Sequence, residues 1–212
     1  MNLSEQYRPR MLSELIGQPK AVKVVERIAE RGIGGRAFWV SGMSGVGKSS
    51  LARIIAGMIA EPLYVQSYVG RKVTPRVLDE IVQLSRYFGL GKGGRVFIFD
   101  EAHGLSKPVI EHLLDFLEHL PSHVVVIFTT TRDGQDALFE DHIDAHPLLS
   151  RCVQIALTNQ GLAQAFAKRA RQIADAEGVN GKPESAYIRL VQRCRNNMRE
   201  VLQAVESGEM LE

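Results

Sequence analysis

The sequence predicts an α/β fold, in which a parallel five-stranded sheet is flanked by helices and followed by a small, entirely helical domain. Five short apolar runs rich in Val, Ile and Phe have the composition of buried strands. Segments with helical spacing of apolar residues lie between these runs, and alternation of strand and helix is typical of a parallel sheet. After residue 156 only helical patterns remain. We therefore expect an α/β domain over residues 1–156 and a helical domain over residues 157–212.

The expected strands are short and bounded by glycine or polar residues. Their apolar residues form continuous runs, as in strands that are buried on both faces of a sheet. In chain order the expected strands are Ala37–Ser41, Leu63–Ser67, Val96–Asp100, Val124–Thr129 and Cys152–Ala156.

The expected helices of the first domain carry apolar residues on one face. One example is Pro75–Phe88, where the spacing brings Val77, Ile81 and Leu84 together. The four expected helices are Pro19–Arg31, Ser49–Ile59, Pro75–Phe88 and Pro108–Leu120.

The second domain is expected to begin at Thr158, which can cap a helix running to about Glu177. Glycine at 178 and the Gly-Lys-Pro sequence at 181–183 interrupt that helix. We interpret this tail as a small lid-like domain, with two further helices near Glu184–Arg195 and Met198–Glu206.

Composition limits the possible classes of protein. The 212 residues are 45% hydrophobic and 24% charged, enough for one good-sized core and a small second domain. The sequence has no run of eighteen apolar residues and a polar N-terminus, so we expect a cytoplasmic protein without a signal peptide or membrane span. Two scattered cysteines, Cys152 and Cys194, are too few for a disulfide framework or a four-thiolate zinc site, and we expect free buried thiols.

Charge is distributed unevenly along the chain. Residues 1–95 carry 15 Lys and Arg against 7 Asp and Glu, whereas residues 96–155 carry 3 against 10. A basic half suits a polyanion such as ATP or DNA, and an unevenly charged solvated surface is the alternative interpretation.

The strongest motif is Gly42-Met-Ser-Gly-Val-Gly47-Lys48-Ser49, which follows an expected strand and precedes an expected helix. It fits the phosphate-binding pattern G-x-x-x-x-G-K-[ST], in which glycines let backbone N–H groups wrap a phosphate at a helix N-terminus. Lys48 is then expected to reach the β- and γ-phosphates, and the Ser49 hydroxyl to coordinate Mg²⁺. The alternative is a glycine-rich turn with an incidental lysine.

A second motif, Val96-Phe-Ile-Phe-Asp100-Glu101, delivers two carboxylates to the end of a buried strand. Ligands of α/β proteins bind at that edge of the sheet. We expect Asp100 to hold Mg²⁺ through water and Glu101 to act as the base that polarises the attacking water. Alone the pattern is weak, but downstream of a phosphate-binding loop it is strong.

Two further elements indicate a role in ATP hydrolysis only when they are taken together with the two preceding motifs. The run Val124–Thr131 is a strand that ends in hydroxyl groups, which could position the attacking water or contact the γ-phosphate. Arg151 lies just ahead of the fifth expected strand, and a guanidinium can stabilise the charge of a phosphoryl transition state.

In this order, the four elements resemble the AAA+ family of ATPases, and specifically its clamp-loader branch. The stretch Tyr7-Arg8-Pro9-Arg10-Met-Leu-Ser-Glu14-Leu15-Ile16-Gly17-Gln18 is similar to the opening box of that branch, which lies against the adenine. Ser150-Arg151-Cys152 is similar to its characteristic triplet, and Asn196-Asn197-Met198-Arg199-Glu200 resembles the sensor-2 helix. The similarity extends from Tyr7 to about Glu206, and the opening box and the triplet are its specific parts.

The resemblance implies roles for individual residues. Arg151 would act in trans on the ATP site of a neighbouring subunit, Arg199 would touch the γ-phosphate, and Thr131 would be sensor 1, with Thr130 as the register alternative. Catalysis is thus expected from Lys48, Glu101, Thr131 and Arg151. Nucleotide binding is expected from Tyr7, Arg8, Pro9, Ile16, Gly17, Gly42, Gly45, Val46, Gly47, Lys48, Ser49, Ser50, Asp100, Met198 and Arg199.

The sequence also departs from the pattern of the family. A cysteine zinc module after the phosphate-binding helix is missing, Leu12 replaces an aromatic residue of the opening box, and Lys107–Ile110 lacks a common glutamine. The sequence stops after the lid, where family members usually continue into a helical collar. This suggests either a truncated chain or a compact variant that assembles differently.

In clamp loaders, the helix before the acidic strand follows the DNA backbone. The corresponding segment here contains Arg71, Lys72, Thr74 and Arg76, and Thr74 can cap a helix whose N–H groups suit a phosphate. We expect DNA contact there, with an ordinary capped surface helix as the alternative. His142 and His146 have a spacing that could bind a metal, but an exposed acidic loop is the preferred interpretation.

The sequence thus predicts an ATPase that uses ATP and Mg²⁺, is stimulated by DNA and is active only as an oligomer. The expected partners are copies or paralogues of the chain, a sliding clamp and primed DNA. Another AAA+ remodeller, such as a helicase loader, and a non-hydrolysing ATP-binding scaffold are the alternatives. A small-molecule kinase would not need the Ser-Arg-Cys element.

Overall fold

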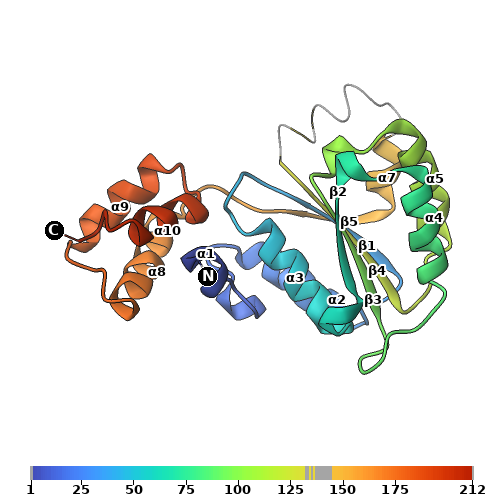
Figure 1. Ribbon diagram of the computed structural model, residues 1–212, viewed down its shortest axis with the longest axis horizontal. Helices are drawn as coiled ribbons and strands as arrows, with labels where there is room; N and C mark the ends of the chain where they lie inside the picture. The colour runs from blue at the N-terminus through green and yellow to red at the C-terminus, as the bar shows by residue number, and fades with distance from the viewer. Residues whose placement is uncertain (1, 132–133, 135, 137–144, 212) are drawn as a thin grey trace.

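The computed structural model describes all residues except 1, 132–133, 135, 137–144 and 212. Its centre is a parallel five-stranded sheet with strand order β2-β3-β4-β1-β5 (Figure 1). The expected fold class is therefore confirmed. The strands are β1 (Arg36–Ser41), β2 (Val65–Val69), β3 (Arg95–Asp100), β4 (Val124–Thr130) and β5 (Cys152–Ala156).

Helices cover both faces of the sheet, because alternate strand residues point to opposite faces and both sets are apolar. On one face Phe38 and Ile127 pack in a core with α2 (Pro19–Ala29) and α3 (Lys48–Ile59). On the other face Trp39 and Phe128 pack in a second core (Figure 1). The helices of this second layer are α4 (Pro75–Leu84), α5 (Lys107–Glu118) and α7 (Ala145–Ser150).

Several expected boundaries in this domain are wrong: the helices expected to end at Arg31 and Leu120 end at Ala29 and Glu118, and two further differences have a visible cause. The second strand starts at Val65, because a 3₁₀ turn, η2 (Pro62–Tyr64), occupies the start of the apolar run. Helix α4 ends at Leu84 and does not reach Phe88, since the chain turns at Ser85, whose hydroxyl donates to the Val82 carbonyl at 2.7 Å. The glycine-rich segment that follows then leads into β3.

Three helices follow the sheet: α8 (Ala163–Ala176), α9 (Glu184–Arg193) and α10 (Met198–Glu206). The expected cap at Thr158 is wrong, because α8 begins five residues later. The Thr158 hydroxyl instead accepts from the Gln160 N–H at 3.0 Å, and its backbone is held by Gln18. The start of α10 matches the expectation, with Asn197 as its cap.

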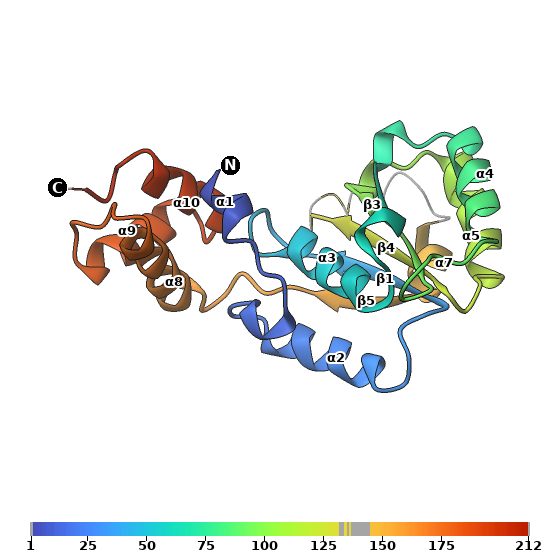
Figure 2. The ribbon, with the colours of Figure 1, turned by 60° about the horizontal axis from the view of Figure 1, so that its bottom comes forward.

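The C-terminal helices lie beside the carboxyl edge of the sheet, next to a short N-terminal helix, α1 (Leu3–Gln6), which the sequence did not predict (Figures 1 and 2). Their apolar side chains, including Phe166 and Tyr187, belong to the same core cluster as α2 and α3. We propose that residues 157–212 act as a lid on the sheet domain. None of the helices in the described part of the chain is long and apolar enough to span a membrane.

The two cysteines, at 152 and 194, are free as expected, but each is only partly buried.

Candidate nucleotide-binding site

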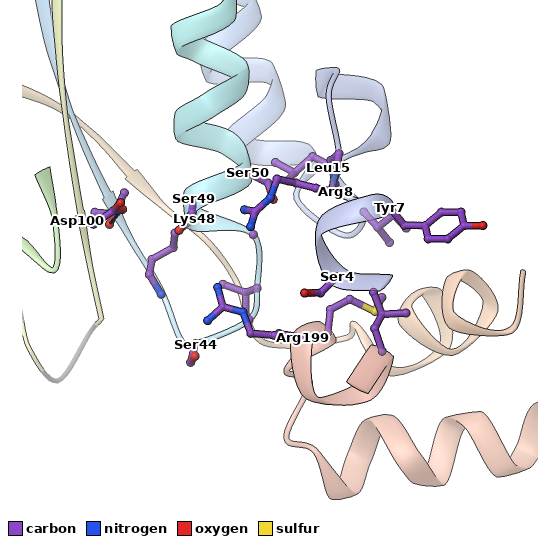
Figure 3. A pocket seen from close by; sticks show the side chains of 18 of the residues that line it. Ser4, Tyr7, Arg8, Leu15, Ser44, Lys48, Ser49, Ser50, Asp100 and Arg199 are labelled. Carbon is purple, nitrogen blue, oxygen red and sulfur yellow. Dashed lines mark hydrogen bonds between the residues drawn. The ribbon is translucent and has the colours of Figure 1, made fainter. Parts of the chain in front are cut away.

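A cavity of about 450 Å³ lies where the sheet, the N-terminal segment and the C-terminal helices meet (Figure 3). Its walls come from five parts of the chain that are far apart in sequence: the opening segment, the loop between β1 and α3 with the first turn of α3, the end of β2 with Arg71, the carboxyl ends of β3 and β4, and helices α8 and α10. The carboxyl edge of a parallel sheet is the usual ligand site of an α/β fold.

The glycine-rich loop forms the floor of this cavity, as predicted, and continues into α3. Gly45 has a φ of 75°, and a Cβ at this position would lie 1.8 Å from Asn197 Oδ1. Only glycine therefore allows the loop to approach α10 so closely. The Met198 N–H donates to the Gly45 carbonyl at 3.3 Å, so the first residue of α10 is bonded directly to this loop.

Lys48 is positioned at the first turn of α3. Its Nζ donates to the carbonyls of Gly42 and Met43, both at 2.8 Å. The pKa of Lys48 is lowered to about 8, chiefly by burial and also by the nearby Arg199, whereas Asp100 opposes the shift. Figure 3 shows Arg199 extending from α10 toward the loop of Lys48. Two neighbouring cations in a partly buried cavity favour a polyanionic ligand.

The carboxyl ends of β3 and β4 place acidic and hydroxyl groups side by side. Phe99 and Phe128 are paired in the sheet, so the next residues, Asp100 and Thr129, are neighbours as well. The Thr129 hydroxyl donates to Asp100 Oδ1 at 2.8 Å. Glu101 adopts left-handed backbone angles, φ 54° and ψ 50°, which a non-glycine residue rarely holds unless its surroundings require it.

Thr129 is a contact that the sequence analysis did not single out. Thr130 is 3.2 Å from His103 Nδ1, and the Thr131 hydroxyl accepts from the Gly134 N–H at 3.1 Å. All three threonines line the cavity. The expected sensor-1 position, Thr131, with Thr130 as its alternative, therefore lies at the cavity, but Thr129 is the hydroxyl bonded to Asp100. Knowing that β3 and β4 are adjacent would have identified it.

Ser49 and Asp100, the predicted metal ligands, both line the cavity. A hydroxyl and a carboxylate are oxygen ligands of the kind that Mg²⁺ takes alongside water and phosphate. In the described part of the chain no group of three His, Cys, Asp or Glu side chains could hold a metal ion without ligands from elsewhere. The alternative pair His142 and His146 cannot be assessed, since position 142 lies outside the described residues.

The opening segment contributes Tyr7, Arg8, Pro9 and Ile16 to the cavity, as predicted. Gly17 is not among the described lining residues. It packs instead against Leu162, whose Cδ2 would be 2.2 Å from a Cβ at position 17.

Its neighbour Gln18 is only 2% exposed and makes two bonds to one residue. Its Nε2 donates to the Thr158 carbonyl, and its Oε1 accepts from the Thr158 N–H, both at 2.9 Å. The opening segment therefore fixes the linker between β5 and α8.

The C-terminal helices supply Met198 and Arg199, as predicted. They also supply a second arginine, Arg169, whose guanidinium lies 5.9 Å from the Tyr7 ring. The Tyr7 hydroxyl donates to Glu177 at 2.6 Å. Sequence reasoning missed the contribution of α8, although helical spacing places its lining residues on one face: Phe166, Arg169 and Ile173.

The remaining predicted residues lie in three places. Val46, Gly47 and Ser50 line the cavity, whereas Gly42 is not among its described lining residues. Arg151 is also outside that set and is bonded to Glu118 and to the Pro147 carbonyl. The predicted DNA segment has one member at the cavity, Arg71, and the other members, Lys72, Thr74 and Arg76, lie at or near the start of α4.

The Thr74 hydroxyl caps α4 as expected, accepting from the Val77 N–H at 3.3 Å. DNA binding by this segment stays a prediction.

Comparison with known proteins agrees with this geometry. Residues 38–160 match the family described as "ATPase family associated with various cellular activities (AAA)". DNA polymerase III subunit tau of Escherichia coli (strain K12) is 26% identical over 234 residues, covering 98% of this chain and 35% of that protein. DNA polymerase III subunit gamma/tau of Mycobacterium tuberculosis (strain ATCC 25618 / H37Rv) is 30% identical over 156 residues, covering 62% and 27%.

Among solved structures, the Thermotoga maritima RuvB Holliday junction branch migration motor superposes with a TM-score of 0.67 at 26% identity. The match covers 94% of this chain and 64% of that one. The chain spans 35% and 27% of the length of the two curated relatives above. The family match covers more than half of the chain and includes the glycine loop, both acidic residues and Arg151, so this protein belongs to the AAA family of ATPases.

Proposed function

We propose that this chain is an ATP-hydrolysing subunit that loads a sliding clamp onto primed DNA, together with copies or paralogues of itself. The main support is the cavity, which combines the phosphate loop and acidic residues of an ATPase with the opening segment typical of the clamp-loader branch. Sequence similarity to DNA polymerase III subunits supports a replication role in the cytoplasm or at the nucleoid.

The cavity has an apolar end suited to the adenine and a cationic end suited to the phosphates. At the apolar end Leu15, Ile16, Phe166, Ile173 and Leu202 offer surfaces for a flat base. At the other end the N–H groups of the loop and Lys48 would bind the β- and γ-phosphates. We propose that Arg199 contacts the γ-phosphate from the lid, so that binding of ATP draws α10 and the sheet domain together.

Hydrolysis requires a base near the terminal phosphate. Ser49 and Asp100 would hold Mg²⁺, which neutralises phosphate charge when bound. Glu101 would accept a proton from the attacking water, and Thr129 would keep the Asp100 carboxylate oriented. Arg151 is outside the described lining of its own cavity, which supports its proposed role in the ATP site of a neighbour.

A route from DNA to the ATP site is suggested by Arg71, which lies in the predicted DNA segment and also lines the cavity near Glu101. We propose that backbone phosphates contact this segment, which would change the position of Arg71 relative to Glu101. Such contacts would be independent of base sequence and would weaken with salt.

The clamp needs a surface of its own, and the exposed apolar side chains of the described residues suggest one. The four most exposed large ones are Leu63, Tyr87, Phe88 and Leu90. Leu63 lies just before β2 and the other three lie in the loop before β3, so all four are at the amino ends of two adjacent strands, away from the cavity. The loop before β3 is also bonded to the end of α3, because the Gly94 N–H donates to the Ile59 carbonyl at 3.1 Å. An exposed apolar surface formed by side chains from two neighbouring loops is typical of a protein-binding site. We propose that this apolar surface contacts the clamp.

Replacement of Leu90 or Leu63 by aspartate is expected to weaken binding to the clamp of the same organism at least about tenfold, since interface hot spots contribute about 2 kcal/mol or more. ATP binding should be unchanged, because the surface is remote from the cavity. Surface plasmon resonance with immobilised clamp measures the first effect, and Val24→Asp on the exposed side of α2 is the matched control. Wild-type clamp affinity in both variants would rule out this surface.

The proposed function is tested by the rate of ATP hydrolysis per subunit over a range of protein concentrations, with and without primer–template DNA. We expect the specific rate to rise with concentration and to be stimulated by DNA, because each active site would need Arg151 from a neighbour. A flat rate near zero with intact ATP binding would favour a scaffold that does not hydrolyse ATP by itself.

The structural similarity to RuvB favours one alternative, a AAA+ motor that remodels DNA without a clamp. Stimulation by DNA together with no detectable clamp binding would support that alternative.

A further inference from the structure

Arg151 is held by two acceptors from two different helices. Its Nη1 donates to the Pro147 carbonyl of α7 at 3.0 Å, and its Nη2 is paired with the carboxylate of Glu118, the last residue of α5. The Arg151 side chain is 30% exposed and the Glu118 side chain 50% exposed. The pair therefore lies at the surface, where a second molecule can reach it.

The two anchors are fixed by the packing beneath them. In α7, Leu148 is completely buried, and it packs in the same core cluster as Leu113 of α5. The Arg151 N–H also donates to the Leu148 carbonyl at 3.3 Å. The two acceptors of the guanidinium therefore lie on helices that pack against each other in one core.

Among the described residues, the two bonds of Arg151 leave donors for a second ligand. A guanidinium has five N–H donors in a fixed plane, of which these two bonds use two. A hydrogen bond from Arg151 holds the pKa of the Glu118 carboxyl below its usual range, so the carboxylate is charged at neutral pH. The pair thus persists under the conditions in which ATP is bound and hydrolysed.

We propose that Glu118 is a positioning residue that orients Arg151 for the γ-phosphate of ATP bound to a neighbouring subunit. The inference rests on the proposed role of Arg151 in trans. A free arginine side chain samples many rotamers, and ordering it during the reaction costs conformational entropy. Glu118 and the Pro147 carbonyl select one orientation in advance, and misplacement of a catalytic group by about 1 Å can cost about a hundredfold in rate.

The test compares Arg151→Ala, Glu118→Ala, Glu118→Gln and the double variant Arg151→Ala/Glu118→Ala in the ATPase assay with DNA at saturating protein. We expect Glu118→Ala to lower kcat about tenfold with little change in KM, since orientation affects the transition state more than ATP binding. Glu118→Gln, which keeps a hydrogen-bond acceptor, should have an intermediate kcat. In the Arg151→Ala background, Glu118→Ala should have no further effect, because the two residues act as one unit.

Glu111→Ala is the matched control, because Glu111 lies on the same helix and its exposed carboxylate forms a 4.0 Å ion pair with Lys107. Sedimentation velocity of each variant establishes that assembly is unchanged. Wild-type kcat in Glu118→Ala, with a defective Arg151→Ala, would overturn the inference and leave the proposed function intact. Normal turnover of Arg151→Ala would instead overturn the trans role itself.

Two other results would also count against positioning. If the losses of kcat from the two single variants add in the double variant, Glu118 would have a general structural role that is independent of Arg151. If Glu118→Ala hydrolysed ATP faster than the wild type, Glu118 would restrain Arg151 and not position it. If the chain alone does not hydrolyse ATP, NMR of the arginine side chains tests whether Glu118 restricts the motion of the Arg151 guanidinium. We expect restricted rotation of the Arg151 guanidinium in the wild type and fast rotation in Glu118→Ala, and equal rotation in both would overturn the inference.

Discussion

Replacement of Lys48 by alanine is expected to weaken ATP binding about ten- to a hundredfold and to abolish measurable hydrolysis. A hydrogen bond to a charged group contributes about 1.5–3 kcal/mol, and Lys48 is the loop residue placed to bond phosphate oxygens. Its Nζ bonds two loop carbonyls in the structure, so it is already held at the edge of the cavity. Isothermal titration calorimetry measures the loss of affinity, and release of phosphate measures the loss of turnover.

The same variant has a second expected effect, on stability without nucleotide. The lowered pKa of Lys48 means that the folded state disfavours its charge, chiefly because of burial and also because of Arg199. The unfolded chain therefore binds more protons between pH 8 and the ordinary lysine pKa of 10.5, and the Lys48 contribution to stability increases with pH through this window.

Removal of Lys48 should thus leave the melting temperature without ATP unchanged or higher, while the increase in melting temperature on adding ATP is lost. Lys23→Ala on the exposed face of α2 is the control. A wild-type increase in melting temperature with ATP in Lys48→Ala would contradict the assignment of this cavity as the nucleotide site.

Replacement of Glu101 by glutamine is expected to lower the rate of hydrolysis about a hundred- to a thousandfold while ATP still binds. General-base catalysis contributes about 10²–10⁴ in rate, and the amide cannot accept the proton of the attacking water. Glutamine has the same shape as glutamate, so the left-handed backbone at this position should be kept. Single-turnover hydrolysis measures the rate, and fluorescence of a labelled ATP analogue measures binding.

Two controls separate chemistry from folding in this experiment. Glu26→Gln changes an exposed carboxylate on α2 and should have wild-type turnover. Asp100→Asn should impair binding of Mg²⁺ as well as turnover, whereas Glu101→Gln should leave the Mg²⁺ dependence of ATP binding unchanged. If Glu101→Gln hydrolysed ATP normally, another residue of the cavity would have to be the base.

The catalytic elements could be predicted because each is encoded by a short, continuous stretch of chain. The spacing of residues within the glycine loop, and within the apolar strand that ends in Asp100, is sufficient to identify each as a motif. The expected cap at Thr158 failed for the opposite reason. At Thr158 the side chain of Gln18, 140 residues away in sequence, binds the backbone and delays the helix.

The partners of individual side chains could not be predicted from such patterns. The sequence shows three consecutive threonines after the fourth strand, but only the pairing of β3 with β4 brings Thr129, and not Thr131, to Asp100. In the same way, Arg169 enters the cavity because α8 packs against the opening segment.

The sequence by itself therefore determined the fold class and the family, and it singled out the glycine loop and the acidic pair that line the cavity, since these depend on local periodicity and on motifs of neighbouring residues. The tertiary structure alone decided which hydroxyl is bonded to Asp100, how the C-terminal helices are attached to the sheet domain through Gln18 and Asn197, and that Arg151 is held by Glu118. Those contacts join residues that are distant in the chain. They are fixed by strand register and by the packing of helices, which no local pattern specifies.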